Sequence, residues 1–95
     1  MRKMIVRIVS AIGGDVIELN TPANTTISEI KREISRRKRI PEGIFVLAFR
    51  GTEIRNENLT LEQIGASDYD KIYLITRTEG GHLFSLLLEP IISVV

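Results

Sequence analysis

The residues with the clearest chemical potential end a short polar run, Arg77-Thr78-Glu79-Gly80-Gly81. Glycine has no Cβ, so a glycine carboxyl group at the tip of an extended arm can enter a narrow cleft and be activated there. Paired glycines also serve as plain turns between two segments. The pattern therefore predicts either a carboxyl group that is joined to another molecule or a hinge, and the rest of the chain must decide between them.

The segment after the glycines differs from the rest of the chain, because nine of the fourteen residues in 82–95 are Leu, Ile, Val or Phe. The Gly81 carboxyl group is free only after the Gly81–His82 bond is cut. We therefore expect a domain over 1–81 and an apolar extension over 82–95 that is removed by processing. The alternatives are an added strand or packing on the core. A membrane anchor is disfavoured, because a helical span needs about twenty apolar residues and Glu89-Pro90 interrupts this segment.

Composition limits the classes of function. Ninety-five residues with a net charge of +1 predict one small domain and give no reason to expect nucleic acid as a partner. The chain has no cysteine, which excludes disulfides and thiolate metal sites, and its single histidine, His82, has no cluster of ligands to join. Arg7 interrupts the first apolar run, so we expect no export signal and a cytoplasmic protein. We expect neither a metal nor a cofactor, and no enzyme activity.

Periodicity predicts the elements that carry the arm. Apolar residues alternate in the first strand, 4–9, and a glycine turn leads into a second strand. Together the two strands and the turn predict a hairpin. Thr26 and Glu29 have the spacing of a capping box at the start of one amphipathic helix, in which isoleucines recur at helical spacing. The second strand is expected at 16–19. The remaining three are expected at 44–49, from residue 54 for a short distance, and at 71–76.

A basic run, Arg36-Arg37-Lys38-Arg39, ends the predicted helix, and Pro41 prevents its continuation. Cations at this end complement the helix dipole. Binding of nucleic acid is the alternative, but no aromatic side chains are interleaved for base stacking. We therefore interpret the run as a solvated last turn.

The order of these elements is that of a β-grasp fold, and over roughly residues 4–81 the chain resembles ubiquitin and the ubiquitin-like modifiers. This resemblance implies an α+β fold with a mixed sheet of about five strands packed on one helix. It is carried by order and spacing rather than by any single motif. The matching segments are Thr26-Ile27, Ile30-Lys31, Ile34, Ile40-Pro41-Glu42, Leu47-Ala48-Phe49-Arg50-Gly51, Ile54, Thr60-Leu61 and Arg77-x-x-Gly80-Gly81.

The resemblance also implies a chemistry for the glycines. A metalloprotease or a cysteine protease would cut Gly81–His82, and an activating enzyme would adenylate the Gly81 carboxylate. The acyl group would pass as a thioester to a conjugating enzyme and then, with or without a ligase, form an isopeptide bond with a target lysine. Arg77 lies where such modifiers contact the activating enzyme. Glu79 departs from the family, because ubiquitin has a basic residue beside its glycines.

The resemblance further implies a partner-binding patch on the exposed face of the sheet, made by Ile12, Ala48, Tyr73 and Ile75. Candidate chain-forming lysines are Lys31 and Lys71, although lysine is scarce and single attachments are expected over long chains. We expect a monomer that acts without a membrane.

Two functions of other classes stay open. Related β-grasp proteins with a terminal Gly-Gly are sulfur carriers, which form a C-terminal thiocarboxylate. A non-conjugated interaction domain is the other, and it predicts that replacing Gly80 and Gly81 leaves function intact.

Overall fold

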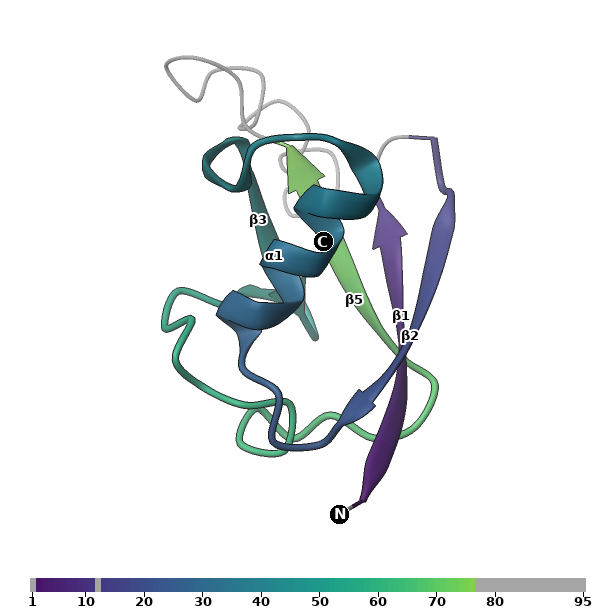
Figure 1. Ribbon diagram of the computed structural model, residues 1–95, viewed down its shortest axis with the longest axis vertical. Helices are drawn as coiled ribbons and strands as arrows, with labels where there is room; N and C mark the ends of the chain where they lie inside the picture. The colour runs from purple at the N-terminus through teal and green to yellow at the C-terminus, as the bar shows by residue number, and fades with distance from the viewer. Residues whose placement is uncertain (1, 12, 77–95) are drawn as a thin grey trace.

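The computed structural model describes residues 2–11 and 13–76 as one helix-and-sheet unit (Figure 1). The elements in chain order are the strands β1 (Lys3–Ser10) and β2 (Val16–Pro22), the helix α1 (Ile27–Lys38), the 3₁₀ helix η1 (Glu42–Ile44), and the strands β3 (Phe45–Phe49), β4 (Thr52–Glu53) and β5 (Asp70–Thr76).

The strands form one mixed sheet in the order β2-β1-β5-β3-β4. β1 and β5 pair in parallel at its centre, and all the other pairs are antiparallel. α1 crosses one face of this sheet (Figure 1). The structure thus confirms the predicted mixed five-stranded sheet on one helix, and it makes β5, the strand that leads to the arm, a central strand.

Three predicted boundaries were wrong, one at the end of β2 and two near β3. β2 continues past Leu19 to Pro22, because residues 20–22 pair with residues 3–5 of β1. Ile44 belongs to η1 rather than to the strand, because Pro41 starts a tight turn in which the Ile44 amide donates to the Pro41 carbonyl over 3.3 Å. The fourth strand lies before Ile54, because Arg50 and Gly51 both have positive φ, 53° and 79°. That pair forms a two-residue hairpin turn in which pairing resumes at once, at Thr52.

The helix begins and ends as its sequence predicts. The Thr26 hydroxyl accepts from the Glu29 amide over 3.2 Å, and the Glu29 carboxylate accepts from the Thr26 amide over 2.9 Å. This capping box satisfies two backbone donors that the first turn leaves open. Arg39, with a left-handed φ of 57°, ends the helix two residues before Pro41.

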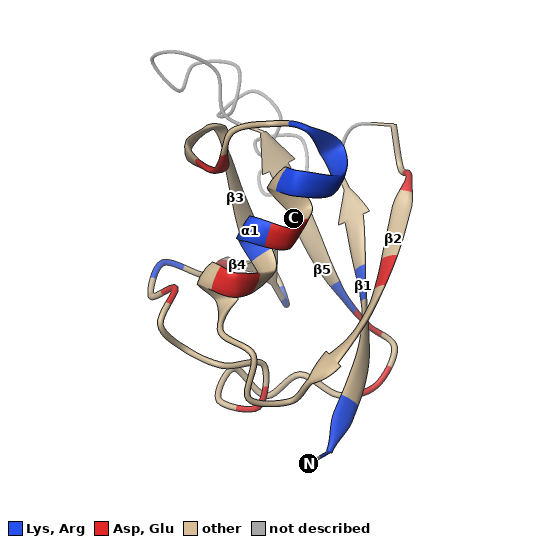
Figure 2. Ribbon diagram, viewed as in Figure 1, with Lys and Arg blue, Asp and Glu red and all other residues tan. Residues whose placement is uncertain are grey.

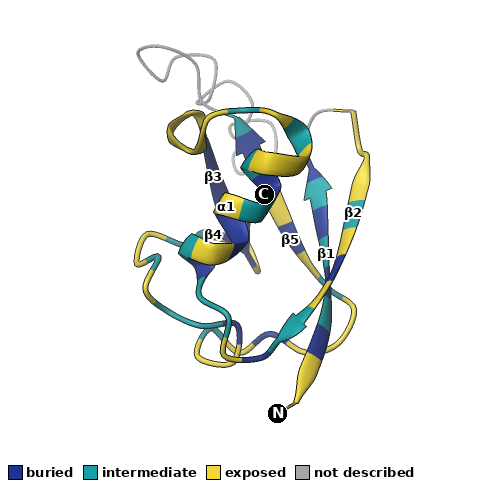
Figure 3. Ribbon diagram, viewed as in Figure 1, coloured by how far each residue is buried: buried dark blue, intermediate teal, exposed yellow. Residues whose placement is uncertain are grey.

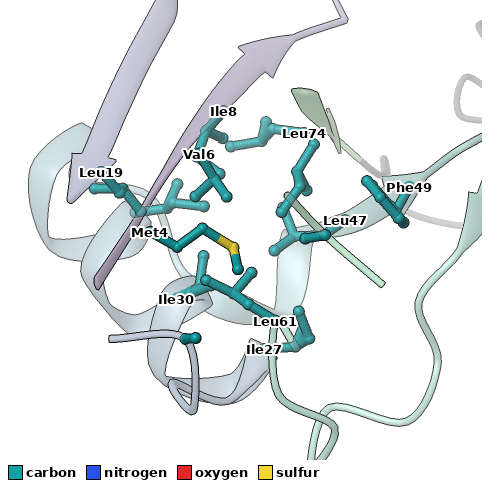
Figure 4. Packing of buried hydrophobic residues seen from close by; sticks show 14 of the residues in the cluster. Met4, Val6, Ile8, Leu19, Ile27, Ile30, Leu47, Phe49, Leu61 and Leu74 are labelled. Carbon is teal, nitrogen blue, oxygen red and sulfur yellow. The ribbon is translucent and has the colours of Figure 1, made fainter. Parts of the chain in front are cut away.

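The core lies between α1 and the inner face of the sheet, the face that α1 covers (Figure 4). Strand alternation fills it as predicted: Val6 and Ile8 of β1 and Ile72 and Leu74 of β5 are buried. α1 contributes its isoleucine stripe, and Leu61 closes the lower end from a turn. The buried cluster comprises Met4, Val6, Ile8, Leu19, Ala23, Ile27, Ile30, Ile34, Phe45, Leu47, Phe49, Leu61, Ala66, Ile72 and Leu74.

Candidate recognition surface and conjugation arm

The arm itself lies outside the described residues, and so do four predicted site residues, Arg77, Gly80, Gly81 and His82. The structure fixes where the arm starts. β5 ends at Thr76, which pairs with Phe45 at the beginning of β3. The chain therefore leaves the sheet beside the first residues of β3.

The outer face of the sheet, the face opposite α1, is built by the alternate residues of each strand. Tyr73 lies between Val9 of β1 and Ala48 of β3, and Ile75 pairs with Val46 one step closer to the end of β5. The strand pairs thus place three predicted patch residues, Ala48, Tyr73 and Ile75, beside one another, together with Val46. The fourth, Ile12, lies outside the described residues.

These neighbours differ sharply in exposure. Tyr73 is 41% exposed, but Ala48 is 8%, Ile75 5% and Val46 7% exposed. Of the three described members of the expected patch, Tyr73 alone is exposed. Val46, Ala48 and Ile75 form a second apolar cluster, separate from the main core. Figure 3 shows β3 as buried along its length.

Further from the end of β5, the outer face becomes charged. Arg7 pairs in register with both Glu18 and Lys71, and its guanidinium lies 3.5 Å from the Glu18 carboxylate. The same guanidinium sits 5.3 Å from the centre of the exposed Tyr69 ring. One sheet face thus has an apolar end, where β5 stops, and a charged end, where β5 begins.

The two candidate chain-forming lysines lie in different environments. Lys31 is only 6% exposed; its amine donates to Glu57 over 2.8 Å and lies 5.2 Å from the centre of the Phe45 ring. Lys71 is exposed on the outer face of β5. An amine must be accessible and deprotonated to attack an acyl group, so only Lys71 of this pair is placed for attack in the folded protein.

The basic run lies at the C-terminal end of α1 (Figure 2). Three of its four side chains are paired with acidic side chains. The guanidinium groups of Arg36 and Arg37 each lie 2.6 Å from the Glu33 carboxylate, and Lys38 pairs with Asp15. Hydrogen bonds lower the pKa of Glu33, and the one from Arg36 has a larger effect than the one from Arg37. The pKa of Asp15 is lowered mainly by its hydrogen bond with Lys38, with a smaller effect from Ser10. This pairing fits a solvated helix end that also holds the β1–β2 connection.

Sequence reasoning missed two features. Val46 belongs to the outer cluster, and the alternation in β3 could have shown it, because residue 46 shares a face with the predicted residue 48. The Lys31–Glu57 pair joins residues 26 apart and had no local signal. Within residues 2–11 and 13–76, no helix is long and apolar enough to cross a membrane.

The fold, with a helix crossing a five-stranded mixed sheet that has two parallel central strands, is of the β-grasp class. The ubiquitin family model matches residues 6–79, so the chain belongs to the ubiquitin family. It is similar to the solved structure of ubiquitin from Caldiarchaeum subterraneum, with 34% identity and a TM-score of 0.76, over 84% of this chain and 100% of that one.

The fold also matches a ubiquitin-like domain of an Arabidopsis thaliana protein, with 18% identity and a TM-score of 0.73 over 82% of this chain and 81% of that one. At this identity the likeness extends to the fold alone.

Proposed function

We propose that the chain is the precursor of a ubiquitin-like protein modifier. Cleavage between Gly81 and His82 frees the Gly81 carboxylate, which is adenylated, transferred as a thioester and joined to target lysines by an isopeptide bond. The protein itself contributes no catalytic residue. Its partners are the processing protease, the activating and conjugating enzymes with or without a ligase, and the target proteins, in the cytoplasm.

The observation that carries this proposal is the position of the glycines in a chain of this family. Gly80 and Gly81 follow Thr76, the last residue of β5, by four and five residues. Five extended residues span roughly 17 Å, enough to carry a carboxyl group away from the domain and into a separate enzyme. Arg77, the first residue after β5, is our proposed contact with the activating enzyme.

The two candidate lysines differ in whether they could accept the acyl group of another copy of the modifier. Lys71 is exposed, whereas Lys31 is enclosed by Glu57 and Phe45. Of these two lysines, Lys71 and not Lys31 would therefore serve as a site of chain formation. The outer face around Tyr73 is our proposed surface for partners that recognise the attached modifier.

The test is mass spectrometry of the protein and its adducts from its native cell. Trypsin cuts after Arg77, so a conjugated lysine would carry the four residues Thr78 to Gly81, and a protease specific for glutamate would leave Gly-Gly. We expect free protein ending at Gly81 and target peptides with these remnants. Full chains through Val95 with no remnants would contradict the proposal. A free form in which sulfur replaces one carboxyl oxygen would identify a sulfur carrier instead.

A matched pair of variants separates the arm from the fold. The double variant Gly80→Ala, Gly81→Ala should abolish adducts. Gly43→Ala is the control, because a Cβ at Gly43 meets no atom within 4 Å and its φ is not positive. Adducts that survive in the double variant would favour a non-conjugated interaction domain.

A further inference from the structure

The C-terminal end of α1 and the end of β5 lie at the same end of the molecule (Figure 2). One hollow is lined by residues from both, namely Ser10, Asp15, Lys38, Ile40, Leu74 and Thr76. The arm therefore starts beside the basic run Arg36-Arg37-Lys38-Arg39. Any enzyme that takes the Gly81 carboxyl group approaches this end of the domain and can contact the helix end.

The ion pairs at this helix end leave Arg39 without a partner. Glu33 pairs with both Arg36 and Arg37, and Lys38 pairs with Asp15. The four basic side chains of the run thus have two acidic partners. Arg39 is exposed, and it has no ion-pair partner in the part of the chain that the structure describes. The pairing that holds the helix end therefore does not use Arg39.

The backbone of Arg39 gives a second, independent reason to single out this residue. Its φ of 57° lies in the left-handed region, where glycine ends a helix without the steric cost that a side chain brings. The amides of Arg39 and Ile40 both donate to the Ser35 carbonyl, so the bend is fixed. An arginine at this position is unfavourable for the fold, and none of the described acidic residues pairs with it in return.

We propose that Arg39 binds an acidic surface on the activating enzyme that receives the arm, together with Arg36, whose side chain is 71% exposed. This inference rests on the proposed function and gives the chemistry of one partner's surface. Residues 77–81 contain one basic and one acidic side chain, Arg77 and Glu79, so the arm supplies no net positive charge.

Adenylation explains why the domain would supply the cations instead. The reaction brings the Gly81 carboxylate next to the phosphates of ATP, and both groups are anions. Glycine keeps the tip of the arm narrow, which leaves no room for a basic side chain there. Cations beside the start of the arm, paired with acidic side chains at the mouth of the cleft, would steer the domain to the enzyme and hold it there.

Arg50 supplies a matched control at the other end of the sheet. It is also an exposed arginine with a left-handed φ, 53°. Its guanidinium lies 4.0 Å from the carboxylate of Asp70, the first residue of β5. Arg39→Gly and Arg50→Gly thus make the same chemical change, one where β5 ends and the other where β5 begins.

The experiment expresses the full chain of 95 residues in the native cell with a tag at its N-terminus. The native chain is compared with Arg39→Gly, Arg39→Lys and Arg50→Gly. Mass spectrometry gives the amounts of full chain, of free chain ending at Gly81 and of adducts. Circular dichroism of the purified proteins gives the midpoint of thermal unfolding.

We expect Arg39→Gly to lower the amount of adducts at least about tenfold. Free chain ending at Gly81 should accumulate, because cleavage precedes activation. The midpoint of thermal unfolding should equal or exceed that of the native chain, because glycine adopts the left-handed conformation freely. Arg39→Lys keeps the charge and should recover most of the adducts. Arg50→Gly should leave the amount of adducts unchanged.

Several outcomes would overturn the contact with the activating enzyme. Native levels of adducts in Arg39→Gly would leave Arg39 a solvated charge, and equal losses in Arg50→Gly would assign the effect to net charge or stability. Accumulation of full chain through Val95 would assign the cations to the processing protease. Binding of a short single-stranded oligonucleotide that Arg39→Gly weakens would assign them to nucleic acid. A native chain without adducts would instead refute the proposed function, and this inference with it.

Discussion

The two faces of β5 show how one strand can contribute to the core on one side and, in our proposal, to recognition on the other. Ile72 and Leu74 point inward and are 0% and 3% exposed beneath α1, whereas Lys71 and Tyr73 point outward and are exposed. The inner residues are fixed by packing on every side, so their identity is set by the fold. The exposed outer residues Lys71 and Tyr73 are not constrained in this way, and in our proposal the apolar and charged ends of the outer face serve recognition by partners.

The largest expected effect tests this division directly with adjacent residues of β5. Ile72→Ala removes a fully buried side chain and should lower the free energy of unfolding by roughly 2–5 kcal/mol. Tyr73→Ala, its neighbour on the other face, should cost about 1 kcal/mol or less, mainly through strand propensity. Urea unfolding followed by circular dichroism measures both. Equal losses would mean that the two faces are equally packed.

The next effect concerns a charged side chain that lies on the core side, as an exception to the division. Lys31, paired with Glu57 and packed beside Phe45, should be acetylated by acetic anhydride at least about tenfold more slowly than Lys71 in the folded protein. Peptide mass spectrometry gives the two rates. In high urea the rates should converge. Comparable rates without urea would show that Lys31 leaves Glu57 and Phe45 readily. Lys31 would then again be a candidate for chain formation.

The fold was largely predictable, because its signals are local and periodic. Alternation in β1 and β5, the isoleucine spacing of α1 and the Thr26–Glu29 capping box each indicate an element and its inner face without any knowledge of the partner element. The end of β2 and the boundaries near β3 were less predictable. Ile44 has strand chemistry, but the backbone there follows the turn that Pro41 starts, which a hydrophobic pattern does not report.

The candidate site was predictable in position but not in exposure. Strand alternation predicted that Tyr73 and Ile75 point outward, because the direction of a side chain in a strand depends only on the local backbone. Whether an outward side chain is buried depends on neighbours that are distant in the sequence. Ile75, which is 5% exposed and clusters with Val46 and Ala48, shows this. The same limit applies to Lys31, whose partner Glu57 is 26 residues away. The number of residues between the last strand and the two glycines could be counted directly from the sequence.

The smallest expected effect is a dependence of stability on acid at the start of α1. Hydrogen bonds from the backbone amide and then the hydroxyl of Thr26 lower the pKa of Glu29 below its ordinary value of 4.5. The unfolded chain therefore binds a proton more readily than the folded one. This contribution is complete above about pH 4.5 and is lost as the pH falls through the folded-state pKa. Thermal unfolding at several pH values measures it.

The variant Glu29→Gln keeps a capping-box side chain but cannot titrate, so stability should fall less steeply in acid than for the native chain. Glu33 and Asp15, whose pKa values are also lowered, remain in both proteins and supply a common background. An identical slope in the two proteins would mean that Glu29 gains nothing from its charge in the folded state. The cap would then stabilise α1 through the geometry of its hydrogen bonds, with no contribution from the charge of Glu29.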